Sequence, residues 1–531
     1  MEEERPLLWK RSGYSFGRRQ HTTRFKLSSY AVKRPLGRRL WIASACFLLW
    51  APTAGTAAGT SLHRSLVQVL TTANPPDVRV PWRRTGPKSW TGSGVIIAGA
   101  RILTAAHVVA DQVMVEVRRA GNGRRYTATV EHVCHPCDLA LLSVADGEFF
   151  KGSKALPIGH LPELQQPVEV HGFPEGGSGL AITSGIVSRI DVDYYGHTSY
   201  TRLLLVQVDA AVNSGNSGGP AVSDGKLVGI AISALEDAEN IGYIVPAPIV
   251  RHFLNDVKDG RFDGFPDLGF WAQSLESPAL RSKLGLKPDQ GGLLVTAVTE
   301  EGSGHGVMQP GDVLLAINGI AIDADGSVEI ADGVRVDGTF LEQRPQVGET
   351  LNLTLLRNGK VLERTVVMRT SEYLVPPGAF DRDLPYRIYA GLVFQPLTAR
   401  YLFSSKGRQN WLRVYYLNPV MGGTTTRVPN RGIPGRREVV ILTGVLTDEL
   451  TRGYEDIKNT VILSIDGTVV RDLAHLSDLL DSGEGEFVTI LTELGQEIVL
   501  ERKAAEAAHA EILRRYQIPR DRADDLLLSA E

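Results

Sequence analysis

Cysteine is scarce in this sequence. Only three of its 531 residues are cysteines, which excludes a fold held together mainly by disulfides. Cys134 and Cys137 form a C-x-x-C pair with His132 and His135 beside them, but a second ligand pair at zinc-site spacing is missing. The sequence therefore predicts no metal. Two small buried side chains are the favoured interpretation of the pair, and a local disulfide is the alternative.

Long hydrophobic runs are also missing. The longest, residues 40–51, has twelve apolar or small residues, whereas a membrane-spanning helix needs about 20. The run suits a signal peptide, and small residues at 53–59 offer a cleavage site. Residues 1–60 are thus predicted to be a basic segment with a signal peptide or an uncleaved anchor. Export to a bacterial periplasm is the first expectation, and an organelle such as the chloroplast is the alternative.

The chain has little net charge, −3, and its positive charge is local. Residues 1–40 contain eleven basic and three acidic residues, and the rest of the chain is acidic overall. This pattern argues against a nucleic-acid partner. A hydrophobic fraction of 43% and a length of 531 residues indicate a globular protein of three or more domains. The 55 glycines and 28 prolines favour many turns and short strands.

A serine flanked by glycines, Ser217 within residues 215–220 (GNSGGP), is the strongest candidate nucleophile. Glycines allow a sharp turn that brings successive N–H groups close to a reacting carbonyl. The same letters fit the nucleophile elbow of α/β-hydrolases. An elbow serine opens a helix, however, whereas Pro220 and the Val/Ile-rich run after it indicate a turn and a strand.

The order of the other catalytic candidates separates these alternatives. His107 ends a β-like apolar run, and Asp138 begins a second such run. Both lie upstream of Ser217, so the order is His, Asp, Ser. That order is typical of chymotrypsin-like double barrels, whereas an α/β-hydrolase places its acid and histidine after the serine. An esterase of the latter class is therefore excluded.

The motifs around these residues resemble those of the HtrA/Deg family of serine endopeptidases. The resemblance rests on residues 104–107 (TAAH), 138–142 (DLALL), 172–174 (GFP) with 183–188 (TSGIVS), and 209–220 (DAAVNSGNSGGP). It extends over about residues 65–531, and the second half is most similar to the plant-type Deg branch. The resemblance implies a mainly β fold, a chymotrypsin-like double β-barrel followed by two α+β PDZ domains.

The same resemblance implies the activity and the partners. It implies endoproteolysis of unfolded or misfolded proteins, as in protein quality control, with no cofactor. It also implies a homo-oligomer built from trimers. A chaperone or peptide-binding scaffold, with proteolysis secondary, is the alternative function. The plant-type likeness adds weight to the organelle alternative.

The predicted domain order follows from these motifs and from turn-rich linkers. A trypsin-like protease domain is expected at 61–258, a first PDZ domain at 262–370, a linker at 371–388, a second PDZ-like domain at 389–500 and a C-terminal helix at 501–531. Residues 461–467 (VILSIDG) repeat residues 313–319 (VLLAING), which indicates the second PDZ domain. Its pattern is more divergent, so weaker peptide binding is expected there.

Roles can be assigned to individual residues. Ser217 would attack the scissile carbonyl, His107 would act as general base and then acid, and Asp138 would orient the imidazole. The oxyanion hole is expected from Gly215, Asn216 and Ser217.

Two binding sites are expected as well. A small apolar substrate pocket would prefer small aliphatic residues before the scissile bond, and a loop at the start of the first PDZ domain would capture a peptide C-terminus through its N–H groups. The residues predicted for the pocket are Ala211, Val212, Ile230, Ala231 and Ile232, and those predicted for the loop are Leu268, Gly269 and Phe270.

Overall fold

The computed structural model describes residues 62–175, 179–198, 201–232, 241–371, 373–376, 378, 380–404, 435–524 and 526. The leader predicted within residues 1–60 lies outside these residues. In the part of the chain that the structure describes, no helix is long and apolar enough to cross a membrane.

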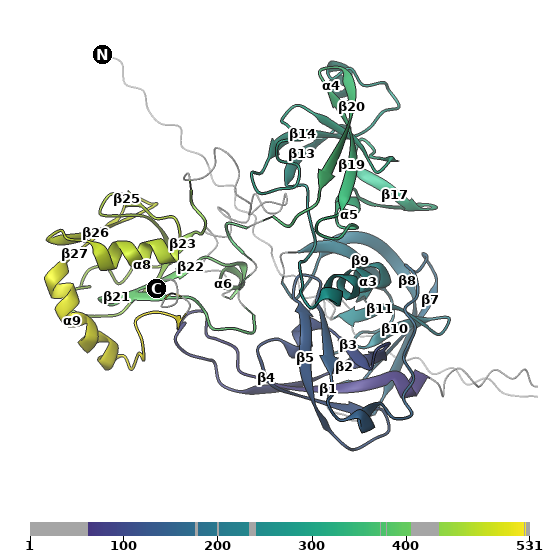
Figure 1. Cartoon of the computed structure of the whole chain (residues 1–531), viewed down its shortest axis with the longest axis horizontal. Helices are drawn as coiled ribbons and strands as arrows, with labels where there is room; N and C mark the ends of the chain where they lie inside the picture. Colours follow the sequence, from purple (N-terminus) through teal and green to yellow (C-terminus); the bar gives the residue numbers. More distant parts are fainter. Residues whose placement is uncertain are drawn as a thin grey trace, which may run out of the picture. The chain divides into compact units, whose positions relative to one another are not determined.

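The first barrel is a closed ring of six antiparallel strands in the order β1-β2-β3-β6-β5-β4 (Figure 1). Closure pairs each strand on both sides and leaves no open sheet edge. Its strands are β1 (Leu66–Ala73), β2 (Lys88–Ile97), β3 (Arg101–Thr104), β4 (Gln112–Arg119), β5 (Tyr126–Cys134) and β6 (Leu139–Ser143). The short helix α2 (Ala106–Val109) follows β3 directly.

The second barrel repeats this arrangement in the order β10-β11-β12-β9-β8-β7. Its strands are β7 (Pro167–Gly172), β8 (Ala181–Tyr194), β9 (Arg202–Val208), β10 (Pro220–Ser223), β11 (Lys226–Ile232) and β12 (Gly242–Pro246). Helix α3 (Ala247–Asp256) then closes the protease region, with a proline in its first turn, where the missing N–H costs no hydrogen bond. Three 3₁₀ turns, η1 (His63–Ser65), η2 (Gly147–Phe150) and η3 (Val257–Asp259), complete this region. The predicted double barrel is thus confirmed.

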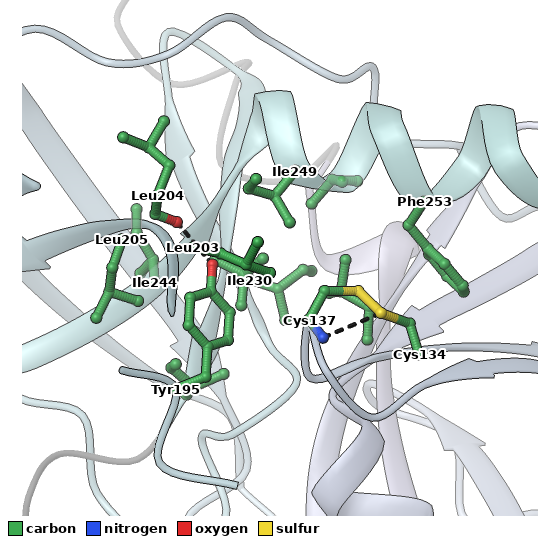
Figure 2. Packing of buried hydrophobic residues seen from close by; sticks show 14 of the residues in the cluster. Cys134, Cys137, Tyr195, Leu203, Leu204, Leu205, Ile230, Ile244, Ile249 and Phe253 are labelled. Carbon is green, nitrogen blue, oxygen red and sulfur yellow. Dashed lines mark hydrogen bonds between the residues drawn. A yellow bond between two sulfur atoms is a disulfide. The ribbon is translucent and has the colours of Figure 1, made fainter. Parts of the chain in front are cut away.

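Aliphatic side chains pack together inside the second barrel (Figure 2). Ile230 and Ile244, on the paired strands β11 and β12, are fully buried. Tyr195 is also fully buried, and its hydroxyl donates to the carbonyl oxygen of Leu204 at 2.7 Å. A buried tyrosine needs such a partner for its polar end. Phe253 of α3 belongs to the same apolar cluster.

A third sheet, in the order β13-β14-β15-β19-β20, lies in the stretch predicted to be the first PDZ domain. Its strands are β13 (Phe270–Ser274), β14 (Leu293–Val298), β15 (Val313–Ile317), β19 (Thr350–Arg357) and β20 (Lys360–Val367), and β16 (Ile320–Ala321) pairs with β15. A separate hairpin, β17 (Ser327–Ala331) with β18 (Val334–Asp337), and helices α4 (Pro278–Lys283) and α5 (Thr339–Glu342) accompany it. Strand β13 is an edge of the sheet.

A fourth sheet, in the order β21-β22-β23-β24-β26-β27, forms the second PDZ domain. Its strands are β21 (Arg387–Tyr389), β22 (Leu392–Pro396), β23 (Val440–Val445), β24 (Thr460–Ile465), β26 (Phe487–Thr492) and β27 (Glu497–Glu501), with β25 (Thr468–Val469) beside β24. The helices are α6 (Ala399–Phe403), α8 (Leu473–Ser482) and α9 (Arg502–Arg515). Helix α9 lies in the stretch predicted to be helical and buries Ala505 and Ile512.

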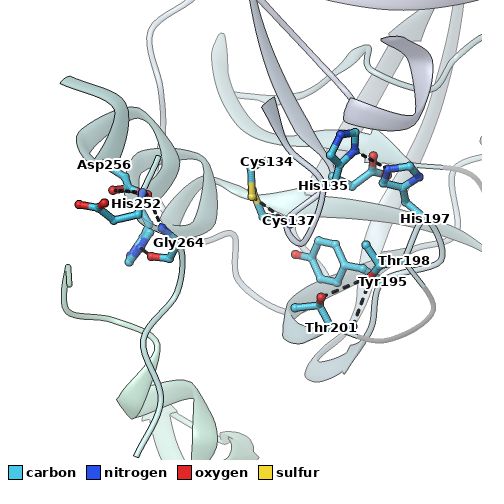
Figure 3. The surroundings of a disulfide bond; sticks show 12 residues. Cys134, His135, Cys137, Tyr195, His197, Thr198, Thr201, His252, Asp256 and Gly264 are labelled. Atoms are coloured by element: carbon cyan, nitrogen blue, oxygen red, sulfur yellow. Dashed lines mark hydrogen bonds between the residues drawn. A yellow bond between two sulfur atoms is a disulfide. The ribbon is translucent and has the colours of Figure 1, made fainter. Parts of the chain in front are cut away.

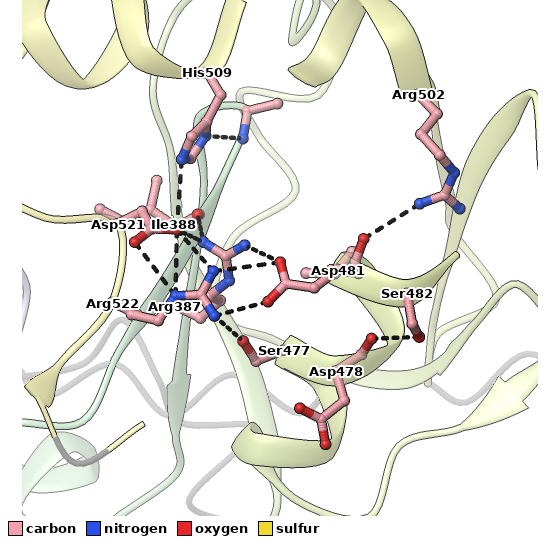
Figure 4. A network of polar contacts seen from close by, with 12 residues as sticks. Arg387, Ile388, Ser477, Asp478, Asp481, Ser482, Arg502, His509, Asp521 and Arg522 are labelled. Carbon is pink, nitrogen blue, oxygen red and sulfur yellow. Dashed lines mark hydrogen bonds and ion pairs between the residues drawn. The ribbon is translucent and has the colours of Figure 1, made fainter. Parts of the chain in front are cut away.

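An ion-pair network holds strand β21 in the second PDZ domain (Figure 4). The guanidinium of Arg387, 3% exposed, pairs with Asp481 of α8 at 2.7 Å and with Asp521. Arg522 also pairs with Asp481 at 2.7 Å. The N–H of Ile388 donates to the Asp521 carbonyl oxygen at 2.6 Å. Breaking one partner of such a network leaves a buried charge unpaired, so β21 is firmly fixed.

Candidate active site

The catalytic acid and base predicted from the sequence lie side by side. His107 is on α2, directly after β3, and Asp138 directly precedes β6, the strand paired with β3. The Nδ1 of His107 lies 2.7 Å from Oδ2 of Asp138, and the backbone N–H of His107 donates to Oδ1 at 2.9 Å. One carboxylate thus fixes both the ring and the backbone of His107. Nδ1 carries the proton in this arrangement, which leaves Nε2 as the basic nitrogen.

Burial and charge act against each other on the pKa values of this pair. Burial alone would lower the pKa of His107, but the charge and the hydrogen bond of Asp138 outweigh it and raise the pKa above its ordinary 6.5. Burial alone would raise the pKa of Asp138, but His107 lowers it below its ordinary 3.8. Asp138 therefore stays ionised at neutral pH and stabilises the imidazolium that forms during catalysis.

Ser217 comes from the second barrel, in the turn before β10. Its carbonyl oxygen accepts from the N–H of Ser93 on β2 at 2.8 Å. The next residue, Gly218, has φ of 82°, and a Cβ there would lie 2.3 Å from Oγ1 of Thr104 and 2.9 Å from the nitrogen of Ala105. Glycine alone permits this approach. The serine turn therefore packs against the segment that leads into His107.

The three residues predicted for the oxyanion hole lie in the turn before β10. The N–H of Asn216 donates to the carbonyl oxygen of Asn213 at 2.9 Å, so this structure commits it to its own turn. The N–H of Asn216 could join the predicted oxyanion hole only if its hydrogen bond to Asn213 broke. Gly215 has φ of 93°, and its carbonyl oxygen accepts from the Ser93 hydroxyl at 2.7 Å. Ser93 also accepts from the N–H of Phe173 at 2.8 Å. The sequence analysis did not single out Ser93, because no local pattern marks this anchoring role.

Comparisons with known proteins identify the family. Residues 92–230 match the trypsin-like peptidase domain family, and residues 375–525 match a PDZ domain family. The chain is 36% identical to Protease Do-like 2, chloroplastic, of Arabidopsis thaliana over 88% of this chain and 76% of that protein. It is 34% identical to Protease Do-like 4, mitochondrial, of the same plant, over 86% and 84%.

The chain belongs to the HtrA/Deg family of serine proteases. A more distant relative, the serine protease DegP homolog of Plasmodium falciparum, is 27% identical over 86% of this chain and 67% of that protein. Among solved structures, the HtrA-type protease AlgW with decapeptide is 24% identical, covering 59% of this chain and 97% of that one, with a TM-score of 0.44. This Deg protein is thus a serine endopeptidase, as predicted from its motifs.

The residues predicted for the substrate pocket of this Deg protease fall into two groups. Ile230 is fully buried inside the barrel (Figure 2), and Ile232 lies on the same face of β11. These two do not fit a wall that touches substrate. Ala231 exchanges backbone hydrogen bonds with the serine turn, Gly218 N–H to Ala231 O and Ala231 N–H to Gly219 O, both 2.8 Å.

The two predicted pocket residues that precede Ser217 in the chain are Ala211 and Val212. Val212 is 8% exposed, and a Cβ at Gly242 would lie 2.5 Å from its Cγ2. The side chain of Thr183 donates to the carbonyl oxygen of Ala211 at 2.8 Å. Ala231 is fully buried, so of the five predicted pocket residues only Ala211 and Val212 stay candidates for a contact with substrate.

The carboxylate loop predicted in the first PDZ domain, Leu268 to Phe270, lies at the start of edge strand β13. The N–H of Leu268 donates to Oε2 of Glu342 at 2.9 Å, so a carboxylate of the chain itself already occupies one of its donors. Glu342 is 7% exposed. Burial, with a smaller effect of Asp267, raises the pKa of Glu342 to about 8. No local sequence pattern indicates this contact, because Glu342 lies more than 70 residues from the loop.

The equivalent strand of the second PDZ domain, β22, is covered. Strand β21 pairs with it, with Ile388 opposite Val393. A peptide that added to this edge would have to displace β21 from the ion-pair network of Arg387. This arrangement provides a physical reason for the weaker peptide binding predicted there.

Cys134 and Cys137 are joined by a disulfide and are fully buried (Figure 3). The favoured interpretation of two separate small side chains was therefore wrong, and the local disulfide is correct. The pair ends immediately before Asp138, so it closes the turn that carries the catalytic acid. Among the described residues, no group of three His, Cys, Asp or Glu side chains could hold a metal ion.

The raised pKa of His107 predicts how activity depends on pH. A general base must be neutral, so kcat/KM should fall as the pH is lowered, with a midpoint above 6.5. In Asp138→Asn the charge is lost and burial remains, so the midpoint should move to lower pH while the maximal rate falls about 10⁴-fold. Initial rates on a short peptide substrate between pH 5 and 9 measure both, and an unchanged midpoint in the variant would contradict the assignment.

Proposed function

We propose that this endopeptidase cleaves unfolded proteins by acyl transfer through Ser217, His107 and Asp138. The observation that carries the proposal is that the buried Asp138 carboxylate accepts two hydrogen bonds from His107. One comes from the ring at 2.7 Å and one from the backbone N–H at 2.9 Å. Ser217 Oγ attacks the scissile carbonyl, and His107 Nε2 takes its proton and later gives it to the leaving amine. The tetrahedral oxyanion is stabilised by backbone N–H groups of Gly215 and Ser217.

The cellular setting proposed is protein quality control inside an organelle. The relatives Protease Do-like 2 and Protease Do-like 4 carry the descriptions chloroplastic and mitochondrial, which favours the organelle alternative. The comparisons give no support to the periplasmic expectation. A trimer-based homo-oligomer stays a prediction from the family resemblance.

Peptide capture by the first PDZ domain is part of the same proposal. Strand β13 is an edge strand, so an extended peptide can add to it by main-chain hydrogen bonds. Its terminal carboxylate would take the place of the Glu342 carboxylate on the loop of Leu268, Gly269 and Phe270.

Replacing the nucleophile tests the proposed mechanism. Ser217→Ala should lower kcat on casein by about 10⁶-fold, because no other group forms the acyl-enzyme. It should also abolish covalent labelling by a fluorophosphonate while leaving thermal unfolding near that of the wild type. His107→Ala should lose as much, and the double variant no more, because the two residues act as a unit. Casein cleavage by purified Ser217→Ala at the wild-type rate would refute the assignment.

The second test concerns specificity. The predicted pocket residues Ala211 and Val212 carry no charge that could pair with lysine or arginine. Cleavage of casein should therefore occur mainly after Val, Ala or Ile. Mass spectrometry of the fragments measures this, and a majority of sites after Lys or Arg would overturn the prediction.

The third test concerns the carboxylate loop. Peptides that end in an apolar residue should bind the full-length Ser217→Ala protein, and amidation of the terminus should weaken binding about 10-fold or more, because hydrogen bonds to a charged group are lost. Calorimetry at pH 7 measures both affinities. In Glu342→Gln the preference for the free carboxylate should persist, because the backbone N–H groups of the loop that would bind it are unchanged. Equal affinity for free and amidated peptides would exclude carboxylate capture.

A further inference from the structure

A group of side chains that the mechanism does not use lies beside the catalytic pair. Two of them, Phe380 and Asp381, belong to the segment between the PDZ domains, and a third, Arg400, lies on α6 of the second PDZ domain. We call these three the linker contact. On the protease side they contact His135 and Asp111, which are not catalytic residues but belong to the two loops that carry Asp138 and His107.

On the acid side, Asp381 binds His135. The Nε2 of His135 lies 2.8 Å from Oδ2 of Asp381. The carbonyl oxygen of His135 accepts from the N–H of Asp138 at 3.2 Å. The disulfide from Cys134 to Cys137 closes this same short turn. Two hydrogen bonds, one to the ring of His135 and one to its carbonyl oxygen, therefore connect Asp381 to Asp138.

On the base side, Asp111 follows α2, the helix of His107. Asp111 and Asp381 bind each other reciprocally: the N–H of Asp111 donates to Oδ1 of Asp381 at 2.5 Å, and the N–H of Asp381 donates to Oδ1 of Asp111 at 3.1 Å. The Asp111 carboxylate also pairs with the Arg400 guanidinium at 2.5 Å. It is 6% exposed, and a buried carboxylate needs such partners.

Phe380 closes the space between these two sides. Its ring stacks on His135, with centroids 4.3 Å apart, and lies 4.7 Å from His197. The guanidinium carbon of Arg400 lies 4.7 Å from the Phe380 centroid. His197 is hydrogen-bonded to His135 at 2.9 Å, as Figure 3 shows, and its ring lies 6.1 Å from that of His107. Burial lowers the pKa of His197 to about 4, so it adds no charge beside the catalytic pair at neutral pH.

Further contacts join the same two parts of the chain. Trp82, in the loop between β1 and β2, packs on Tyr386 with ring centroids 6.1 Å apart. The Gln395 side chain donates to the carbonyl oxygen of Val78, in the same loop, at 3.2 Å. The linker contact is thus one end of a continuous surface between the protease loops and the second PDZ domain.

We propose that Asp381 and Arg400 are positioning residues for the catalytic pair, acting through His135 on Asp138 and through Asp111 on His107. The inference rests on the proposed triad. It assigns to the segment after the first PDZ domain an indirect part in the protease reaction. The geometry of the catalytic pair then depends on the contact of the second PDZ domain with the protease loops. Displacement of the two loops by about 1 Å is enough to cost about 100-fold in rate.

Three aspartates of this cluster, Asp111, Asp138 and Asp381, have left-handed backbones, with φ of 54°, 50° and 59°. Aspartate tolerates this conformation better than most residues, but the neighbouring contacts must still hold it in place. Removing the linker contact would therefore release the loops toward other conformations rather than leave them in the same one.

The test compares Asp381→Asn with Asp383→Asn in the full-length protein. Asp383 is a matched control, because it lies in the same segment and pairs with Arg84 instead of a catalytic loop. With a short chromogenic peptide ending in valine, Asp381→Asn should lower kcat about 10-fold or more with little change in KM. Asp383→Asn should keep the wild-type kcat. The downfield proton resonance of the His107–Asp138 hydrogen bond should weaken or shift only in Asp381→Asn.

A second variant keeps the inference testable if Asp381→Asn unfolds. Arg400→Gln should lower kcat in the same way. The double variant His135→Asn/Asp381→Asn should cost no more than His135→Asn alone, because His135→Asn already removes the contact that Asp381→Asn breaks. Wild-type kcat and an unaltered proton resonance in folded Asp381→Asn and Arg400→Gln would overturn the proposal. The proposed triad is refuted by a different result, which is cleavage by the Ser217→Ala variant.

Discussion

The buried carboxylate of Asp138 is the constraint around which the protease region is arranged. The residue is 1% exposed, so its charge must be compensated by neighbours rather than by water. His107 provides the compensation twice, through its ring and through its backbone N–H. Removing the histidine partner from such a pair typically costs about 3–5 kcal/mol, because the charge stays buried without compensation. The same contact that orients the base therefore also stabilises the fold.

Meeting this constraint requires both barrels. The first barrel provides the acid and the base on neighbouring loops, and the second provides Ser217 on a glycine-rich turn. Close packing of Gly218 against Thr104 and Ala105 joins the two, since any side chain at Gly218 would overlap them. Ser93 on β2 adds two contacts between the barrels. Its N–H donates to the carbonyl oxygen of Ser217, and its hydroxyl donates to the carbonyl oxygen of Gly215. The nucleophile is thus positioned by backbone contacts rather than by a flexible side chain.

The two PDZ sheets differ at the edge where a peptide would bind. Strand β13 of the first is an edge, with Glu342 on its loop, whereas β22 of the second is covered by β21. A few charged residues in the second PDZ domain cause this difference between the two edges. Arg387 holds β21 through Asp481 and Asp521, and this network ties the strand to a helix and to the C-terminal segment. Similar sheets can thus offer one open and one closed binding edge.

The amino-acid sequence by itself determined the reaction class and the fold class, and it predicted the residues of the triad. It could do so because Ser217, His107 and Asp138 each stand in a local pattern, a glycine turn or the end of an apolar run, and because their order is diagnostic. It also indicated both PDZ domains through the repeated buried strand and Asn-Gly or Asp-Gly turn.

Tertiary structure decided the features that depend on residues far apart in the chain. No periodic or local pattern in the sequence indicates three of these features. They are the contact of Glu342 with Leu268, the contact of Asp381 with His135, and the pairing of β21 with β22. The inward direction of Ile230 and the hydrogen bond that occupies the Asn216 N–H likewise follow from barrel closure and turn geometry. Sequence patterns report short-range backbone preferences, whereas these contacts exist only once distant segments pack together.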